Sequence, residues 1–163
     1  MNENTLYSPW RMKYIISEKE KSCIFCIDFE KQKAQEHLVV HRSKHCFVIM
    51  NLYPYNNGHI MVVPNRHLAV LSDLKPEELH DLFETVSLSE RVIMKAYSSD
   101  GINVGMNIGK AAGAGIDDHL HVHLVPRWFG DNNFMTTVSG VRVIPEDFEI
   151  SFQRLKEQFD KMT

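Results

Sequence analysis

Residues 119–128 read His-Leu-His-Val-His-Leu-Val-Pro-Arg-Trp. Within them, His119, His121 and His123 alternate with aliphatic residues. Strict alternation over this length is typical of a β-strand with one apolar face and one polar face. We therefore expect the three imidazoles on one side of a strand and the aliphatic side chains in a core. The strand should end near Pro126, because proline cannot donate a hydrogen bond to a sheet.

A row of histidines on one strand face has three chemical uses, which are to bind a metal, to move protons or to attack an electrophile. A metal held by all three is one alternative, although His119 and His123 would lie roughly 13 Å apart at about 3.3 Å per residue. A half-exposed strand that merely carries histidine on its polar face is a second. Arg127 at the strand end favours a phosphate-directed site, in which one histidine attacks and the others hold the charge.

The composition is that of one globular domain and points to no macromolecular partner. The chain has 163 residues, 44% of them hydrophobic and 24% charged, and a formal net charge of −3. That charge gives no general attraction to nucleic acid or membranes. No apolar run approaches the roughly 18 residues that predict a transmembrane helix, and the N-terminus lacks the basic start and apolar core of a secretory signal. We therefore expect a cytoplasmic protein that binds neither nucleic-acid polymers nor membranes.

The pattern of strands predicts the sheet of an α+β fold. Residues 1–22 are polar and predict an irregular N-terminal arm, and residues 23–163 predict a single domain. Short apolar runs separated by turn residues predict an antiparallel sheet of about five strands, at residues 37–40, 46–50, 59–63, 102–109 and from 119 onward.

Two helices complete the predicted fold. Pro76 suits a first helical turn, and residues 98–101 (Ser-Ser-Asp-Gly) end the pattern. Between them an apolar stripe at helical spacing consists of Leu79, Leu82, Phe83, Val86, Ile93 and Tyr97. A C-terminal helix is expected to start near Pro145, with Phe148, Phe152, Leu155, Phe159 and Met162 on one face. The long helix should pack across the sheet.

The cysteines point to a metal or redox site. Two of the three, Cys23 and Cys26, form a Cys-x-x-Cys motif, which in a cytosolic chain favours metal or redox chemistry over a structural disulfide. The motif alone is half of a tetrahedral site. A pair of core cysteines and a redox pair are the alternatives, although the strand-then-helix context of a thioredoxin motif is missing around Cys23. Cys46 lies in an apolar run and should be buried.

Several segments together resemble one family. Residues 119–127 (His-Leu-His-Val-His-Leu-Val-Pro-Arg) resemble the signature of the histidine triad (HIT) superfamily of nucleotide hydrolases and transferases. Residues 51–64 resemble its upstream nucleoside-binding segment, and residues 107–115 its glycine-rich lead-in to the triad. Residues 10–12 and 126–135 resemble the bacterial branch that contains diadenosine tetraphosphate phosphorylases. The resemblance implies a HIT-like nucleotide-binding domain.

The resemblance implies a catalytic group of four histidines, His59, His119, His121 and His123. The middle histidine of the triad, His121, is the attacking residue in the family, which implies a nucleotidyl-histidine intermediate. A neutral imidazole nitrogen is also a good nucleophile near neutral pH. His123 is expected to contact the transferring phosphoryl oxygens or the leaving group, and His59 to face the phosphate. A surface histidine and an exposed turn histidine are the respective alternatives.

The resemblance further implies a nucleotide-binding set of Asn51, Leu52, Asn107, Gly113, Gly115 and Arg127. Asn51 would hydrogen-bond the ribose, Leu52 would pack on the base and Asn107 would contact the nucleotide. Many members carry a glutamine or serine where Ala114 and Gly115 stand here, so backbone N–H groups of the glycine-rich loop are the expected donors to phosphate. Arg127 would neutralise distal phosphates. A simple turn asparagine at 51 and a solvated arginine at 127 remain alternatives.

A structural zinc ion and a partner subunit are also implied by the resemblance. Some histidine triad proteins, and the related galactose-1-phosphate uridylyltransferases, complete the Cys-x-x-Cys half-site with two histidines. The matching positions here are His67 and the first triad histidine, His119, with His45 as a rival ligand. Family members pair as homodimers, often with one sheet continuous across two subunits.

The implied activity is transfer of a nucleotidyl group from a dinucleoside polyphosphate to His121 and then to phosphate or water. The segments shared with the bacterial branch favour a phosphorylase. An adenosine phosphoramidase or mononucleotide hydrolase of the same superfamily is the alternative, because it would use His121 in the same way. A nucleotide-binding protein with little turnover and a histidine-based metal hydrolase remain as other classes. No organic cofactor is expected.

Overall fold

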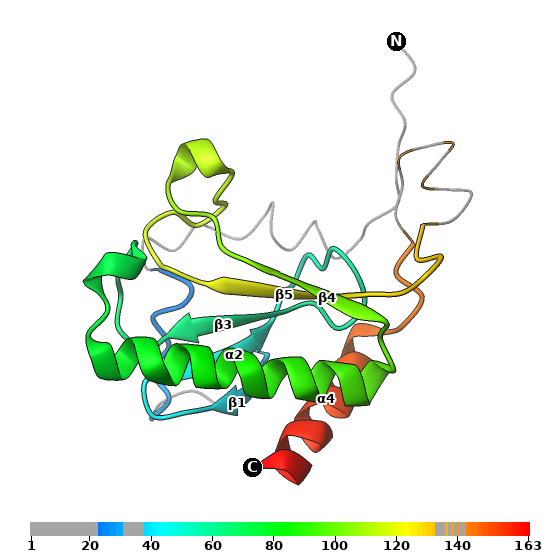
Figure 1. The fold of residues 1–163 in the computed structure, drawn as a ribbon, viewed down its shortest axis with the longest axis horizontal. Coiled ribbons are helices and arrows are strands. Elements are labelled where there is room, and N and C mark those ends of the chain that lie inside the picture. Colours follow the sequence, from blue (N-terminus) through cyan, green and yellow to red (C-terminus); the bar gives the residue numbers. More distant parts are fainter. Residues whose placement is uncertain (1–22, 31–37, 133–135, 137, 139, 141–142) are drawn as a thin grey trace.

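The structure is a computed structural model that describes residues 23–30, 38–132, 136, 138, 140 and 143–163. The expectations for an arm over residues 1–22 and for the motif at 10–12 lie outside these residues. Five strands form one antiparallel sheet in the order β1-β2-β3-β5-β4 (Figure 1). Their bounds are Val39–Arg42 (β1), Cys46–Met50 (β2), Ile60–Pro64 (β3), Gly101–Gly105 (β4) and Val122–Arg127 (β5).

Two helices lie on one face of this sheet, the long α2 (Pro76–Tyr97) and the C-terminal α4 (Phe148–Met162) (Figure 1). Short 3₁₀ turns, η2 (Leu71–Asp73) and η3 (Lys110–Ala112), interrupt the connections. The predicted fold, an antiparallel sheet with a long helix and a C-terminal helix, is confirmed. None of the helices in the described part of the chain has the length and apolarity needed to cross a membrane.

The histidine-bearing strand, β5, lies between β3 and β4. His123 is opposite Met61 of β3 on one side and Gly105 of β4 on the other. β5 begins at Val122, so the prediction of a strand from residue 119 was wrong at its start. The backbone N–H of Leu120 donates instead to the carbonyl oxygen of Leu68 at 2.6 Å, outside the sheet.

The end of β5 agrees with the prediction, because the strand ends at Arg127, directly after Pro126. The end of the neighbouring strand differs from the expected one. β4 ends at Gly105 rather than at residue 109. Gly109 has a φ of 81°, which departs from the extended region, and the chain there turns into η3.

Helix α2 begins and ends where the sequence indicates. Pro76 is at its start, and the side chain of Glu78 accepts a hydrogen bond from the backbone N–H of Lys75 at 2.9 Å. Ser98 has a φ of 47° and ends the helix in the left-handed region. Part of the predicted stripe was wrong, because Leu79 and Phe83 are exposed.

The buried face of α2 is displaced around the helix from the predicted stripe and is partly polar. Leu82, Val86 and Ile93 are buried together with Thr85 and Ser89, whose small polar side chains a hydrophobic pattern does not mark. Helix α4 packs on α2 and β1 and buries three of its five predicted residues, Phe152, Leu155 and Phe159. Its N-cap is Asp147, whose carboxylate accepts from the N–H of Glu149 at 2.9 Å.

Alternating side chains divide the sheet between two apolar layers. Val48, Val62 and Leu124 point to the helices. Phe47 and Met61 point to the opposite face, where Phe25 of the N-terminal segment covers β1, β2 and β3. Over β4 and β5 that second face carries the polar side chains, so it is the face on which a site can form.

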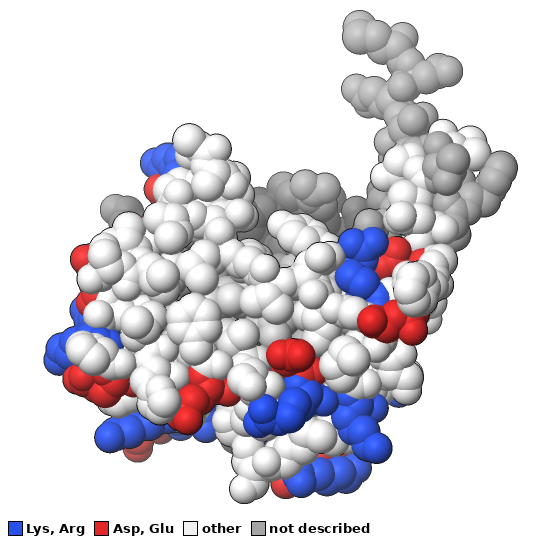
Figure 2. Space-filling view, viewed as in Figure 1, with Lys and Arg blue, Asp and Glu red and all other residues white. Residues whose placement is uncertain are grey.

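The helix-bearing face shows no broad field of one charge. In Figure 2, which views the molecule from this side, acidic and basic side chains lie close together along the lower edge and at the right of the view, around a largely uncharged centre. This distribution agrees with the small net charge of the sequence.

Candidate functional site

Three histidines meet on the face of the sheet opposite the helices. His123 is on β5, His121 is in the extended segment before it, and His59 directly precedes β3. Nε2 of His59 lies 2.9 Å from Nδ1 of His123, and the ring centroids of His121 and His123 are 4.8 Å apart. The fold thus brings together three of the four histidines predicted to be catalytic.

The hydrogen bonding of His121 fixes which ring nitrogen is available. Nδ1 of His121 donates to the carbonyl oxygen of His119 at 2.9 Å. In a neutral imidazole the other nitrogen, Nε2, then carries the lone pair. His121 is 5% exposed, and its ring packs on the ring of Phe25, with the two ring centroids 5.2 Å apart. His121 therefore has one buried, oriented nitrogen with an available lone pair.

A chain of hydrogen bonds orients the other two rings. The backbone N–H of Tyr55 donates to Nδ1 of His59 at 3.1 Å. The proton of neutral His59 is then on Nε2, which donates to Nδ1 of His123. His123 accepts at Nδ1 and so carries its own proton on Nε2. The pair of His59 and His123 therefore presents one N–H donor, which is Nε2 of His123 on β5.

Burial keeps His59 and His123 neutral. Burial first, and then the proximity of His123 and of His121, together lower the pKa of His59 to about 3. Burial also lowers the pKa of His123 to about 4, with the proximity of His121 as the second cause. At neutral pH both rings are therefore uncharged, as the hydrogen-bond chain requires.

His119 lies in a separate group with two cysteines and a second histidine. Its Nδ1 is 3.3 Å from Sγ of Cys23 and 3.9 Å from Sγ of Cys26, and Nδ1 of His67 is 3.3 Å from Sγ of Cys26. The candidate ligand atoms of all four residues lie within 4.8 Å of one another. These are the four residues predicted from the sequence to bind a metal.

The donor set fits a zinc ion, and the two 3.3 Å distances between a ring nitrogen and a sulfur match the ligand spacing of such an ion. Two sulfurs and two imidazole nitrogens are a common tetrahedral zinc set, and zinc–ligand bonds of about 2.0–2.3 Å imply ligand–ligand distances of roughly 3.3–3.8 Å. Nε2 of His119 donates to the carbonyl oxygen of Pro64 at 2.9 Å, so its Nδ1 lone pair faces the cysteines.

The rival ligand, His45, is outside this group, and its backbone N–H donates to Asp81 at 2.8 Å. Cys46 is buried as predicted, and burial raises the pKa of its thiol to about 12.

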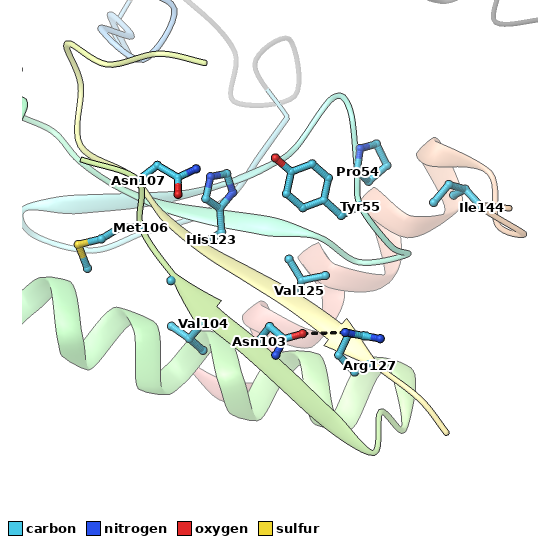
Figure 3. Close-up of a pocket in the computed structure, with 11 residues that line it drawn as sticks. Pro54, Tyr55, Asn103, Val104, Met106, Asn107, His123, Val125, Arg127 and Ile144 are labelled. Carbon is cyan, nitrogen blue, oxygen red and sulfur yellow. Dashed lines mark hydrogen bonds between the residues drawn. The ribbon is translucent and has the colours of Figure 1, made fainter. Parts of the chain in front are cut away.

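A cleft of about 700 Å³ lies over β4 and β5, beside His123 (Figure 3). Two residues of the predicted nucleotide-binding set, Asn107 and Arg127, line it. Gly113 and Gly115 lie in the exposed loop around η3 and outside this lining. The sequence did not single out most of the other residues of the cleft, including Tyr55 and Asn103.

Asn51 and Leu52 lie in the turn that leads to His59. The side-chain oxygen of Asn51 accepts from the N–H of Tyr53 at 2.9 Å, and its backbone N–H donates to the carbonyl oxygen of His59 at 3.0 Å. Leu52 is 52% exposed. Its apolar side chain therefore lies at the surface, next in the chain to Asn51.

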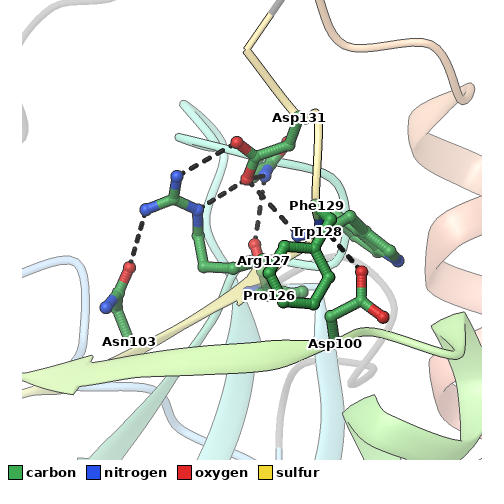
Figure 4. Close-up of polar contacts among 8 residues, drawn as sticks. Asp100, Asn103, Pro126, Arg127, Trp128, Phe129 and Asp131 are labelled. Carbon is green, nitrogen blue, oxygen red and sulfur yellow. Dashed lines mark hydrogen bonds and ion pairs between the residues drawn. The ribbon is translucent and has the colours of Figure 1, made fainter.

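Arg127 is held in place by a carboxylate (Figure 4). Its Nε and Nη2 donate to the two carboxylate oxygens of Asp131 at 2.6 and 3.0 Å, and its Nη1 donates to the side-chain oxygen of Asn103 at 3.0 Å. Asp131 also accepts from the side chain of Asn56 at 3.1 Å. Sequence reasoning missed Asp131 and Asn56, because each stands in a stretch that reads simply as a turn.

Comparisons with known proteins agree with this geometry. The HIT domain family model matches residues 32–130. A protein named AP-4-A phosphorylase from Mycobacterium tuberculosis (strain ATCC 25618 / H37Rv) is 40% identical over 149 residues, which cover 86% of this chain and 76% of that protein. A bis(5'-nucleosyl)-tetraphosphatase [asymmetrical] from Schizosaccharomyces pombe is 40% identical over 89 residues, 55% of this chain and 48% of that protein.

Solved structures show the same fold. A crystal structure of a zinc-bound histidine triad family protein from Mycobacterium smegmatis matches with a TM-score of 0.69 and 28% identity, over 86% of this chain and 95% of that one. A histidine triad nucleotide-binding protein from Sulfolobus tokodaii matches with the same score and identity, over 86% and 93%. The family match over more than half of the chain, the 40% identical relative and the geometry of the three histidines lead to one conclusion: the chain belongs to the HIT domain family.

Proposed function

We propose that the protein is an enzyme that cleaves dinucleoside polyphosphates by transferring a nucleotidyl group to Nε2 of His121. The observation that carries this proposal is the hydrogen bond from Nδ1 of His121 to the carbonyl oxygen of His119, which leaves Nε2 with its lone pair beside the donor nitrogen of His123. The names of the relatives support the substrate class, since they include AP-4-A phosphorylase, bis(5'-nucleosyl)-tetraphosphatase and bis(5'-adenosyl)-triphosphatase.

The chemistry requires one nucleophile and neutral donors. Nε2 of His121 forms a bond to the α-phosphorus, and the bond from this phosphorus to the bridging oxygen breaks, so that the leaving polyphosphate takes the electron pair. The N–H at Nε2 of His123 donates to the transferring phosphoryl group or to the leaving oxygen, and His59 holds His123 in this tautomer. Phosphate or water then attacks the same phosphorus and releases His121.

We assign the nucleoside contacts to the residues that match the family. Asn51 holds the ribose, Leu52 packs on the base, and Asn107 contacts the nucleotide. The backbone of the loop that contains Gly113 and Gly115 donates to phosphate. For Arg127 the pairing with Asp131 supports a role as an oriented donor of hydrogen bonds, because the carboxylate neutralises its charge locally.

We propose that Cys23, Cys26, His67 and His119 hold a structural zinc ion. Its contribution would be to tie the N-terminal segment to the stretch that leads into β5. His119 then acts on catalysis through its backbone, because its side chain is a ligand while its carbonyl oxygen orients His121. The four ligand atoms and the hydrogen bond that fixes the tautomer of His119 support this assignment.

We further propose a cytoplasmic homodimer built on a single domain from residue 23 to 163. One feature supports the dimer and another supports the cytoplasmic location. β4 is an edge strand of the sheet, and its Val104 is 51% exposed, so the edge offers backbone groups and an apolar side chain to a second copy. The unpaired cysteines suit a reducing compartment. Light scattering on the purified chain measures the mass directly, and a monomer at micromolar concentration contradicts the dimer.

The test of the activity is a product analysis with diadenosine tetraphosphate, with and without inorganic phosphate. ADP and ATP that form only with phosphate identify a phosphorylase. AMP and ATP that form without phosphate identify a hydrolase with the same intermediate. Replacing His121 by asparagine should abolish either reaction. Absence of cleavage under both conditions, alongside release of AMP from adenosine phosphoramidate, overturns the proposed substrate class.

A further inference from the structure

Polar and apolar side chains both line the cleft over β4 and β5 (Figure 3). Its floor is Val125, whose partner on β4 is Asn103. The polar lining residues, here called the polar wall, are Asn103 of β4, Asn107 after this strand and Arg127 of β5, and the apolar Val104 and Met106 line the cleft between Asn103 and Asn107 in the chain. The wall formed from the turn before β3 and the segment before α4 is apolar or aromatic and consists of Pro54, Tyr55 and Ile144. An amphipathic ligand with a hydrogen-bonding edge and a flat apolar part matches such a cleft.

The cleft is continuous with the reactive histidines. His123, Val125 and Arg127 alternate along one face of β5, so the floor extends from the histidine pair for roughly 13 Å at about 3.3 Å per residue. Gly105, directly opposite His123, also lines the cleft, and a Cβ added there would meet no atom within 4 Å. The absence of a side chain at Gly105 keeps the passage from His123 into the cleft open.

The polar wall is organised to donate hydrogen bonds. Arg127 donates to the side-chain oxygen of Asn103, which leaves the amide nitrogen of Asn103 as that side chain's remaining polar group. Arg127 itself is fixed by Asp131, whose side chain is 6% exposed. Among the described residues of the lining, the charged one is an arginine and none is a carboxylate. This wall therefore suits an anion held by N–H groups.

The apolar wall suits a flat ring. Tyr55 is 57% exposed and its ring lies 6.1 Å from that of His123, nearly parallel at 28°. Ile144 is 38% exposed at the opposite part of the wall. Aromatic and aliphatic surfaces of this kind hold nucleobases by stacking and apolar contact.

We propose that this cleft binds the leaving half of the substrate, the nucleoside polyphosphate that departs when His121 takes the nucleotidyl group. Its phosphates follow the polar wall away from His123, and its base packs on the apolar wall. The cleft then distinguishes a dinucleoside polyphosphate from a mononucleotide, which ends before it. This inference rests on the proposed function, and it adds a site for the second nucleoside.

The test measures binding in a variant that cannot turn over. With His121→Asn as background, calorimetry gives the dissociation constants of diadenosine tetraphosphate, which has both halves, and of AMP, which has only the half held beside His121. Ile144→Glu then places a negative charge on the apolar wall. Ile150→Glu makes the same change at another exposed isoleucine, on α4 and outside the cleft. Gly105→Leu places a side chain in the passage from His123 into the cleft, at a position where an added Cβ would meet no atom within 4 Å.

We expect Ile144→Glu and Gly105→Leu each to weaken binding of diadenosine tetraphosphate by about tenfold or more, while AMP binding changes by less than about twofold. Ile150→Glu should change neither constant. Equal weakening of both ligands, or no effect of either cleft variant, overturns the assignment while the proposed function stands. Failure of the background variant to bind either ligand means that the proposed function itself is wrong.

Discussion

The carbonyl oxygen of His119 accepts a hydrogen bond of 2.9 Å from Nδ1 of His121, while the imidazole of the same His119 lies 3.3 Å from Sγ of Cys23. One residue therefore belongs to two sites. Its side chain is part of the candidate zinc cluster, and its backbone determines which nitrogen of the neighbouring histidine is free to react. His119 thus connects the proposed zinc site to the proposed nucleophile, His121.

Removal of the metal should loosen the fold and lower activity together. Chelation of the proposed zinc releases the N-terminal segment and the stretch before β5, so circular dichroism and turnover should decline in parallel. A metal that takes part in the reaction would instead remove activity while the fold stays intact. Cys26→Ser should reproduce the effect of chelation and lower the bound zinc. Cys46→Val, which removes a buried thiol outside the cluster, should leave the zinc content unchanged.

The buried histidines should make the folded state sensitive to acid. The pKa of His59 is lowered to about 3 and that of His123 to about 4, from an ordinary 6.5. Below about pH 6.5 the unfolded chain takes up protons that the folded chain does not, so stability is complete above that pH and falls as the pH falls toward these lowered values. Each group adds a slope of up to about 1.4 kcal/mol per pH unit.

Urea unfolding between about pH 7.5 and pH 4.5 measures this slope. His123→Asn should reduce it, because the variant has no imidazole to protonate at that position. His80→Asn is the matched control, since the side chain of His80 is 76% exposed. An unchanged slope in His123→Asn would show that the acid sensitivity comes from other groups.

The Asp131 carboxylate should matter for both stability and substrate binding. Asp131→Asn removes the charge that receives two hydrogen bonds from Arg127 and one from Asn56. We expect the free energy of unfolding to fall by about 1–3 kcal/mol, the usual cost of weakening such a buried polar group. The KM for diadenosine tetraphosphate should rise, because Arg127 and Asn103 are no longer fixed.

A second pair with the same spacing provides the control for Asp131. Lys156 and Asp160 form an ion pair four residues apart on α4, and the side chain of Asp160 is 60% exposed. Asp160→Asn should change stability by less than about 0.5 kcal/mol, since exposed pairs of this kind contribute little. Equal effects of the two substitutions would mean that the Asp131 cluster has no special role.

Gly58→Ala should destabilise the turn that carries Tyr55 and His59. Gly58 has a φ of 70°, and an added Cβ would overlap the ring of Tyr97. We expect a loss of more than about 2 kcal/mol from the clash and the backbone strain combined. Gly113→Ala separates the two causes, because Gly113 has a φ of 86° with no atom within 4 Å of the added Cβ. Thermal unfolding of both variants is the measurement, and similar losses would exclude the contact with Tyr97 as a cause.

Patterns local in sequence predicted most of the fold. The alternation around His121 predicted a strand, and Pro76 and Ser98 marked the limits of α2. The pattern did not show that His119 leaves the face shared by His121 and His123. That separation follows from the hydrogen bond between Leu120 and Leu68, which is a contact between segments distant in the chain.

The contact between Asn56 and Asp131 could not be predicted from the sequence for the same reason. Asn56 and Asp131 are 75 residues apart, and each looks like an ordinary turn residue. Their contact exists only because β3 and β5 are neighbours in the sheet, which brings the two turns to the same end. The metal cluster was predicted because the Cys-x-x-Cys motif is local and the family resemblance implied the two histidines.

The cluster of Cys23, Cys26, His67 and His119 has a consequence for synthesis of the chain. Its first cysteine and its last histidine are 96 residues apart. As the polypeptide emerges from the ribosome, the two thiols have no complete partner set until His119 has been made. The cluster and the hydrogen bond that orients His121 therefore become possible at nearly the same point of synthesis, when residues 119–121 have been made.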